Sequence, residues 1–191
     1  MRVISAAGNG AESIIGRIAE GFSAARLPYL SVSRGQLVYS SGGRHVDGYA
    51  IDGDGDFRGS IGHMLLASAD LVPFFGGFDE AVVILCPGLS AGDEAVLREF
   101  NGKAYVVAAS ETQVPSGLKR FPLISCGMGA KDTVTFSSIK ADEGIVCLQR
   151  QIRTFGGNVA EMQEYLFEPH GAEAFPALAA FAALLICDLI R

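Results

Sequence analysis

A glycine turn near the start of the chain has the residue types and spacing best suited to binding a ligand. Gly8, Asn9 and Gly10, called here the glycine turn, follow the β-like run 2–7 and precede isoleucines and a phenylalanine at helical spacing. A strand, a tight turn and a helix bring backbone N–H groups together at the positive end of the helix. The pattern therefore predicts an anion site made by Gly8, Asn9, Gly10 and Ser13.

The residues after the glycine turn differ from those of a phosphate loop. Such a loop continues with a lysine that contacts the phosphates and a Ser or Thr that binds Mg²⁺. Here Ala11 and Glu12 hold these positions, and Glu12 favours the helix dipole but repels a nucleotide phosphate. Two interpretations stay open: a structural turn capped by Glu12 and Ser13, or an altered anion site. We expect no cofactor and no catalytic residue, with ATP and Mg²⁺ disfavoured.

An acidic repeat further along has only the beginning of a calcium loop. Asp52, Asp54 and Asp56 have the opening spacing, but a calcium loop also needs glycine at its sixth position and a bidentate glutamate at its twelfth. Phe57 and His63 stand at those positions. The repeat therefore predicts a solvated turn, with a weak adventitious cation site as the alternative.

The cysteines and histidines lack the spacing of metal or redox motifs. The four cysteines stand far apart in apolar contexts, at Cys86, Cys126, Cys147 and Cys187. They predict reduced core thiols in a cytoplasmic protein, because no Cys-x-x-Cys pair is present. A nucleophilic Cys86 or Cys126 would need an adjacent base, and no histidine can be placed beside either from the sequence. The histidines show no paired ligand spacing, so we expect no metal site.

Composition narrows the classes of partner. The 191 residues carry a net charge of −6 and no Lys/Arg-rich stripe, which argues against nucleic acid or an anionic membrane as the main partner. The most apolar run, residues 174–187, is shorter than the ~20 residues that span a bilayer, and it predicts a buried helix. The first residues lack the apolar stretch of a secretory signal. We therefore expect a cytoplasmic location.

The order of the expected elements predicts an α/β fold. Apolar runs and turn residues predict strands and helices in alternation, followed by alternating segments at 134–138 and 145–147 that predict antiparallel strands. We expect one domain, 1–191, with a mainly parallel sheet, helices on both faces and an antiparallel extension. The expected strands are 2–7, 28–33, 36–40, 46–51, 81–86, 103–109 and 123–126, and the expected helices are 14–25, 59–72, 91–101 and 174–190.

These pieces, in this order, resemble the central ATP-binding domain of the Mur ligases and folylpolyglutamate synthetases. Residues 3–13 are similar to the family's strand and phosphate loop, and they keep its Asn9 and Gly10. Residues 103–112 and 123–139 are similar to two further strand regions, and 171–189 to the closing helix. The resemblance implies a P-loop-NTPase-like fold and descent from an ATP-dependent amino-acid ligase.

The departures from the family pattern fall where its chemistry is done. Ala11 replaces the phosphate lysine and Glu12 the magnesium threonine, and the remaining changes are at Ala108, Ser110, Glu111, Glu173 and Ala174. The resemblance therefore implies a stand-alone, degenerate ligase core. We expect a non-catalytic binding or scaffold module for an unknown protein partner or a small anionic ligand, with homo-oligomers allowed. The alternative is a small-molecule or nucleotide-binding enzyme that uses the glycine turn as an anion site.

Overall fold

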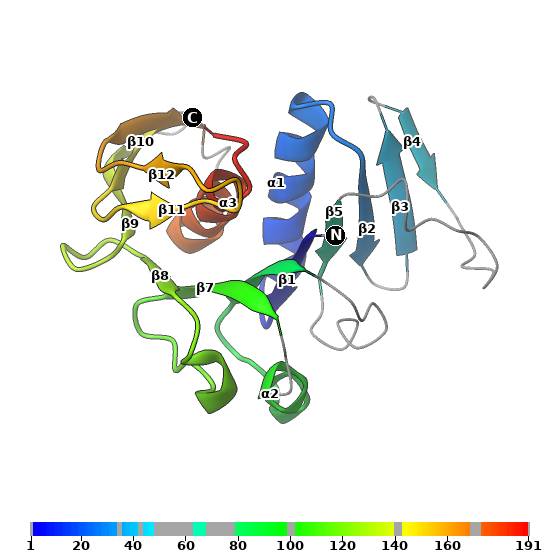
Figure 1. Ribbon diagram of the computed structural model, residues 1–191, viewed down its shortest axis with the longest axis horizontal. Helices are drawn as coiled ribbons and strands as arrows, with labels where there is room; N and C mark the ends of the chain where they lie inside the picture. The colour runs from blue at the N-terminus through cyan, green and yellow to red at the C-terminus, as the bar shows by residue number, and fades with distance from the viewer. Residues whose placement is uncertain are drawn as a thin grey trace.

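A computed structural model of the chain describes residues 2–33, 36–41, 44–47, 63–67, 79–98, 102–139, 143–168 and 173–190 (Figure 1). Its helices are α1 (Ala11–Ala24), α2 (Ala91–Arg98), the short 3-10 helix η3 (Ser116–Leu118) and α3 (Ala174–Ile186). Its strands are β1 (Arg2–Ala7), β2 (Tyr29–Ser33), β3 (Gln36–Ser41), β4 (Arg44–Asp47), β5 (His63–Leu66), β6 (Glu80–Leu85), β7 (Lys103–Ala109), β8 (Leu123–Cys126), β9 (Val134–Ile139), β10 (Gly144–Leu148), β11 (Ile152–Arg153), β12 (Val159–Ala160) and β13 (Glu164–Phe167).

One large mixed sheet organises the chain. Its order is β13-β10-β9-β8-β7-β6-β1-β5-β2-β3-β4, and β11 and β12 pair separately. All pairs from β2 through β9 in this order are parallel, whereas β3, β4, β10 and β13 add antiparallel strands at the two ends. The predicted α/β class with a mainly parallel sheet is confirmed, and the antiparallel additions occupy both ends of the sheet.

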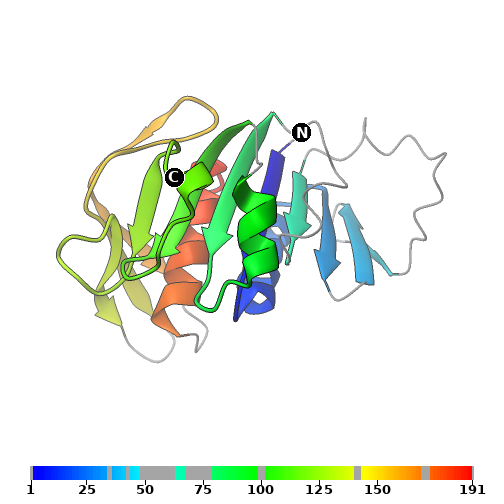
Figure 2. The same ribbon diagram turned by 90° about the horizontal axis from the view of Figure 1, so that it is seen from below.

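Strand β1 lies in the middle of the sheet and directs side chains to two apolar layers. Ile4 and Ala6 belong to the layer that includes α1 and α3, whereas Val3 and Ala7 belong to the layer that includes Leu97 of α2. This division follows from the two-residue period of a strand. Figure 2 shows α2 on one face of the sheet and α1 and α3 on the other, so the predicted cover on both faces is confirmed.

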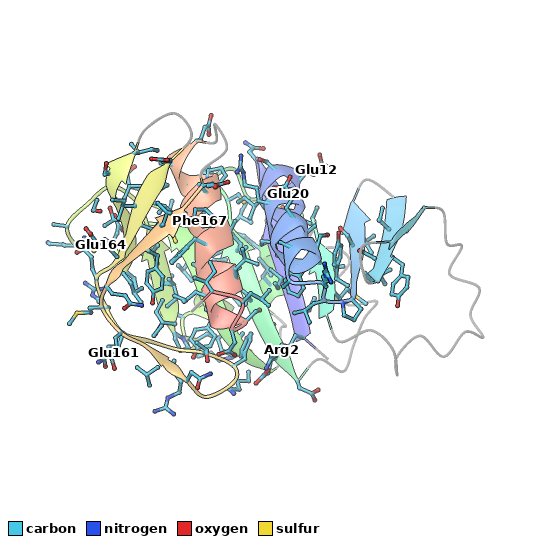
Figure 3. All side chains as sticks on the ribbon, turned by 90° about the horizontal axis from the view of Figure 1, so that it is seen from above. Arg2, Glu12, Glu20, Glu161, Glu164 and Phe167 are labelled. Atoms are coloured by element: carbon cyan, nitrogen blue, oxygen red, sulfur yellow. The ribbon has the colours of Figure 1, made fainter. Side chains whose placement is uncertain are left out.

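Helix α3 is a core element, as its sequence predicts. Every residue from 177 to 186 is buried, which fits a helix that is apolar on nearly every side. Its Phe181 makes edge-on ring contacts with Tyr165 and Phe167 at centroid distances of 5.2 and 5.4 Å, and Figure 3 labels Phe167 on the strand beside the helix. Within the described residues, no helix has the length and apolar character to cross a bilayer.

One expected helix is wrong. The sequence predicts a helix over 59–72, but residues 63–66 form β5, which is paired in parallel between β1 and β2. Met64, Leu65 and Leu66 are all buried. A short strand that is covered on both faces has a continuous apolar run without alternation, and periodicity alone does not separate it from part of a helix. Residues 59–62 and 68–72 lie outside the described residues.

The strand order reverses at the carboxyl ends of β1 and β6. After β1 the chain crosses toward β2 on one side of the sheet, and after β6 it proceeds to β7 on the other side. In open α/β sheets, ligands bind where the strand order reverses in this way. The glycine turn follows β1, and Cys86 and Pro87 follow β6, so both segments lie at this point.

Two glycines of α1 provide a matched test of the packing between α1 and α3. A Cβ at Gly21 would lie 2.8 Å from both Leu184 Cδ atoms, whereas a Cβ at Gly16 would have no described atom within 4 Å. We expect Gly16→Ala to raise the free energy of unfolding by about 0.5–1 kcal/mol through helix propensity. Gly21→Ala should raise it less or lower it, because Leu184 must move. If urea denaturation gave the same increase in the free energy of unfolding for both variants, the result would contradict this packing.

Candidate functional site

The glycine turn fits tightly against the segment that follows β6. Gly8 has φ of 99° and Gly10 has φ of 85°, and Gly10 is the N-cap residue of α1. A Cβ at Gly8 would lie 2.8 Å from the carbonyl oxygens of Cys86 and Pro87. The positive φ and the lack of space both require glycine at this position. The predicted strand, turn and helix are confirmed.

The backbone of the turn is hydrogen-bonded within the protein. The Asn9 N–H donates to the Pro87 carbonyl at 2.8 Å, and the Ala11 N–H donates to the Gly8 carbonyl at 3.3 Å. Two N–H groups that a phosphate cradle would use are thus already engaged. Ala11 is only 4% exposed and packs in the core beside α3, so the lysine position of a phosphate loop is here a buried apolar contact.

Ser13 lies apart from the other predicted site residues. It is exposed and borders a separate hollow of about 460 Å³ along α1, together with Gly16, Arg17 and Glu20. Ser13 is not among the residues that line the groove described next.

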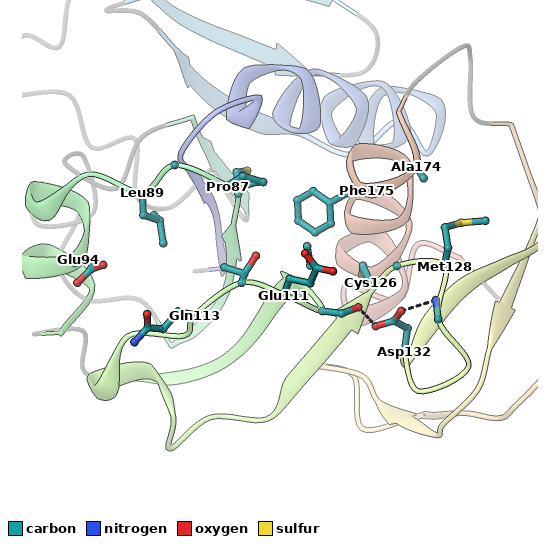
Figure 4. Close-up of a pocket in the computed structure, with 17 residues that line it drawn as sticks. Pro87, Leu89, Glu94, Glu111, Gln113, Cys126, Met128, Asp132, Ala174 and Phe175 are labelled. Atoms are coloured by element: carbon teal, nitrogen blue, oxygen red, sulfur yellow. Dashed lines mark hydrogen bonds between the residues drawn. The ribbon is translucent and has the colours of Figure 1, made fainter.

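An open groove of about 910 Å³ begins beside the glycine turn (Figure 4). It is bounded by the segments that follow β6, β7 and β8 and by the first residues of α3. Its wall combines apolar side chains with carboxylates, among them Leu89, Glu111, Met128, Asp132 and Phe175. Figure 4 shows the Glu111 carboxylate directed toward the Phe175 ring. The groove thus presents an aromatic face and a negative charge to the same space.

Asp132 fixes the turn that forms one end of the groove. Its side chain is 4% exposed; one carboxylate oxygen accepts a hydrogen bond from the Ser110 hydroxyl and the other accepts from the Gly129 N–H at 2.9 Å. A buried carboxylate needs such partners. Because the Ser110 proton is directed to Asp132, the Ser110 oxygen offers the groove only lone pairs.

Acidic residues stand at the N-terminal ends of all three α-helices described. Glu12 lies in the first turn of α1, and Glu173 is the N-cap residue of α3. At α2, the Asp93 carboxylate accepts hydrogen bonds from the Ser90 N–H at 3.0 Å and the Ser90 hydroxyl at 2.8 Å. Helix α3 also has Pro176 in its first turn, which supplies no N–H. The helix ends that usually attract anions are therefore offset by negative charge.

The cysteines at the groove are unreactive core thiols. Cys86 and Cys126 line its floor and are buried. Burial raises the pKa of the Cys86 thiol to about 12, and burial together with the Asp132 charge raises the pKa of Cys126 still further. Burial also raises the pKa of Cys187 to about 12. The prediction of core thiols is confirmed for these three, while Cys147 is partly exposed.

The structure joins several positions that the sequence singles out one by one. Ser110, Glu111 and Ala174, three departures from the family pattern, all line the groove. Gly8, Asn9 and Gly10 do not line the groove; the glycine turn adjoins it through Pro87, whose carbonyl accepts the Asn9 N–H. The sequence reasoning missed Phe175 and Asp132 as parts of a site, although the location of Asp132 in the loop that follows β8 was a usable signal.

The acidic repeat and one histidine fall in parts of the chain that the structure does not describe, since Asp52, Asp54, Asp56 and His170 lie outside the described residues. Within the described part of the chain, no group of three or more His, Cys, Asp and Glu side chains is placed to hold a metal ion.

Comparison with known proteins shows a likeness of fold. No protein family matches the sequence, and no curated protein does. Among solved structures, the chain is similar to a Mur ligase. That protein is UDP-N-acetylmuramoyl-L-alanyl-D-glutamate–2,6-diaminopimelate ligase, with a TM-score of 0.63 and 13% identity over 98% of this chain. The chain spans 42% of that ligase's length. At this identity the likeness shows a Mur-ligase-like α/β fold.

Thiol labelling tests the burial of the cysteines. At pH 8, well below the raised pKa of Cys86, its thiol stays protonated and shielded, so Ellman's reagent should react first with the partly exposed Cys147. We expect Cys147→Ser to remove the fast phase in the native protein, whereas Cys86→Ser leaves it intact. Unfolding in guanidinium should expose every remaining thiol. A fast native phase that is lost in Cys86→Ser would contradict the buried position of Cys86.

Proposed function

We propose that this chain is a non-catalytic, Mur-ligase-like module that binds a small ligand in the groove between the strand ends and α3. The proposal rests on what occupies the position where a phosphate loop would have its lysine. Ala11 is buried in the core and the N–H groups of Asn9 and Ala11 donate inside the protein. Ala11 supplies no cation there, and two of the amides that a triphosphate would use already donate inside the protein.

The charge around the strand ends supports the same proposal. Phosphoryl transfer relies on cations and N–H donors that stabilise the negative charge of the transferred group. Here Glu12, Glu111 and Glu173 bring negative charge to the helix start or strand end where they stand. These residues would repel a nucleotide phosphate and the intermediates formed from it.

The groove itself has the properties of a binding site. Its volume of about 910 Å³ lies within the ~300–1,000 Å³ common for small-molecule pockets. Leu89, Met128 and Phe175 provide apolar surface, and Asp132 holds one end of the groove in a fixed shape. These properties support binding without requiring any reaction.

An enzyme that holds an anion on the glycine turn is the second candidate. It is favoured by the left-handed Gly8 and Gly10 at the start of α1, a helix of 14 residues, since such a helix end attracts anions. For this function the Asn9 N–H must leave the Pro87 carbonyl when the ligand binds.

Binding and hydrolysis of Mg-ATP distinguish the two candidate functions. We expect the native chain to show no ATP hydrolysis and no saturable binding by calorimetry up to millimolar nucleotide. Ala11→Lys combined with Glu12→Thr restores the two family residues, yet we expect at most weak ATP binding and no turnover, because the other departures remain.

The matched control places the same charge change elsewhere on α1, as Gly16→Lys combined with Glu20→Thr. It should bind ATP no better than the native chain. Hydrolysis by the native chain that is lost in Gly10→Ala would overturn the non-catalytic proposal and favour the second candidate.

A further inference from the structure

We propose that the groove binds a small organic cation, with its ammonium group at Glu111 and its apolar part against Phe175 and Met128. This inference rests on the proposed function, since it names the class of ligand for the same groove. It begins from a cavity whose wall is aromatic on one side and carries a carboxylate directed toward that aromatic ring (Figure 4).

The charged side chains that line the groove are all carboxylates, and the Thr112 hydroxyl and the Gln113 amide beside them can both donate and accept hydrogen bonds. Glu94, Glu111 and Asp132 contribute carboxylates to the lining. The Ser110 hydroxyl donates its proton to Asp132, so its oxygen adds another acceptor. An ammonium group supplies up to three donors and a positive charge, and it matches such a wall. A phosphate or carboxylate ligand would be repelled by the negative charge of these carboxylates.

The three carboxylates do not contribute equally. Asp132 is buried and already accepts two hydrogen bonds, so it acts on a ligand through its charge. Glu94 forms an exposed ion pair with Arg98 at 3.3 Å, which offsets part of its charge. Glu111 is exposed at the groove and is the carboxylate that a bound cation would contact directly.

The apolar wall favours an organic cation over a metal ion or a hydrated inorganic ion. Met128 is 63% exposed, and Phe175 and Leu89 border the same cavity. A cation against an aromatic face is attracted by the negative face of the ring, and a flexible methionine adapts to the attached hydrocarbon. Burying these side chains under a ligand removes apolar surface from water.

The described part of the groove wall carries no positively charged side chain. Among the described residues that line the groove there is no lysine, arginine or histidine. The adjoining helix start, at Glu173, is acidic and is followed by Pro176, which lacks an N–H. The charge and the apolar surface of the groove therefore both favour a cation with a hydrocarbon part.

Three probes of nearly equal size test the inference by amide chemical-shift titration of the full chain. Benzylammonium carries a positive charge, benzyl alcohol is neutral and benzoate is negative. We expect benzylammonium to shift the amides of residues 110–113 and 127–129 and to bind at least about fivefold more tightly than benzyl alcohol, a difference of about 1 kcal/mol. Benzoate should bind more weakly than both.

Two variants identify the contacts. Glu111→Gln should weaken benzylammonium binding about five- to tenfold, as expected for loss of a partly exposed charge-assisted contact, while it leaves benzyl alcohol unchanged. The control Glu20→Gln removes the same charge from α1 outside the groove and should change neither affinity. Phe175→Leu should reduce the preference for benzylammonium over benzyl alcohol, because it removes the ring and keeps apolar volume.

The outcomes distinguish this inference from the proposed function. If benzyl alcohol or benzoate binds the groove as tightly as benzylammonium, the cation assignment is wrong while a non-catalytic binding module stands. If benzylammonium shifts no groove amide, or if Glu111→Gln and Glu20→Gln weaken it equally, the assignment is also overturned. ATP hydrolysis by the native chain would instead remove the proposed function.

Discussion

The close approach of the glycine turn to the end of β6 is the constraint on which the rest of the structure depends. Gly8 has no room for a Cβ beside the carbonyls of Cys86 and Pro87, and the Asn9 N–H joins the two segments by a hydrogen bond. This contact fixes the two central parallel strands at the point where the strand order reverses. It therefore determines both where α1 begins and where the groove opens.

The same contact preserves the strand, turn and helix of the fold but leaves the turn without some of the groups that bind a nucleotide. A strand, turn and helix with this spacing remain, together with a Mur-ligase-like sheet. The N–H groups of Asn9 and Ala11 are engaged, Ala11 is packed in the core, and acidic residues stand at the helix starts. The ligand-accessible volume lies beyond the turn, over β7 and β8. Its electrostatics differ from those that a nucleotide requires, which is the basis of the proposed organic-cation site.

Sequence patterns predicted the central sheet well because buried parallel strands and amphipathic helices have strong local signals. The apolar runs were enough to predict the strands β1, β6 and β7, and the helical spacing of apolar residues was enough to predict α1. β5 was missed because its three apolar residues, Met64 to Leu66, are too few to show a period. The groove was harder to predict, since Glu111, Asp132 and Phe175 come from three segments that only the strand order brings together. Their charge and exposure could not be combined before that order was known.

A crystal structure determined after soaking in Mg-ATP tests the central claim most directly, because it reports the turn and the groove at once. The account predicts that the Asn9 N–H stays on the Pro87 carbonyl and that no triphosphate density lies on the glycine turn. Ordered triphosphate and Mg²⁺ density on the turn, with the Asn9 N–H released toward a phosphate oxygen, would contradict it.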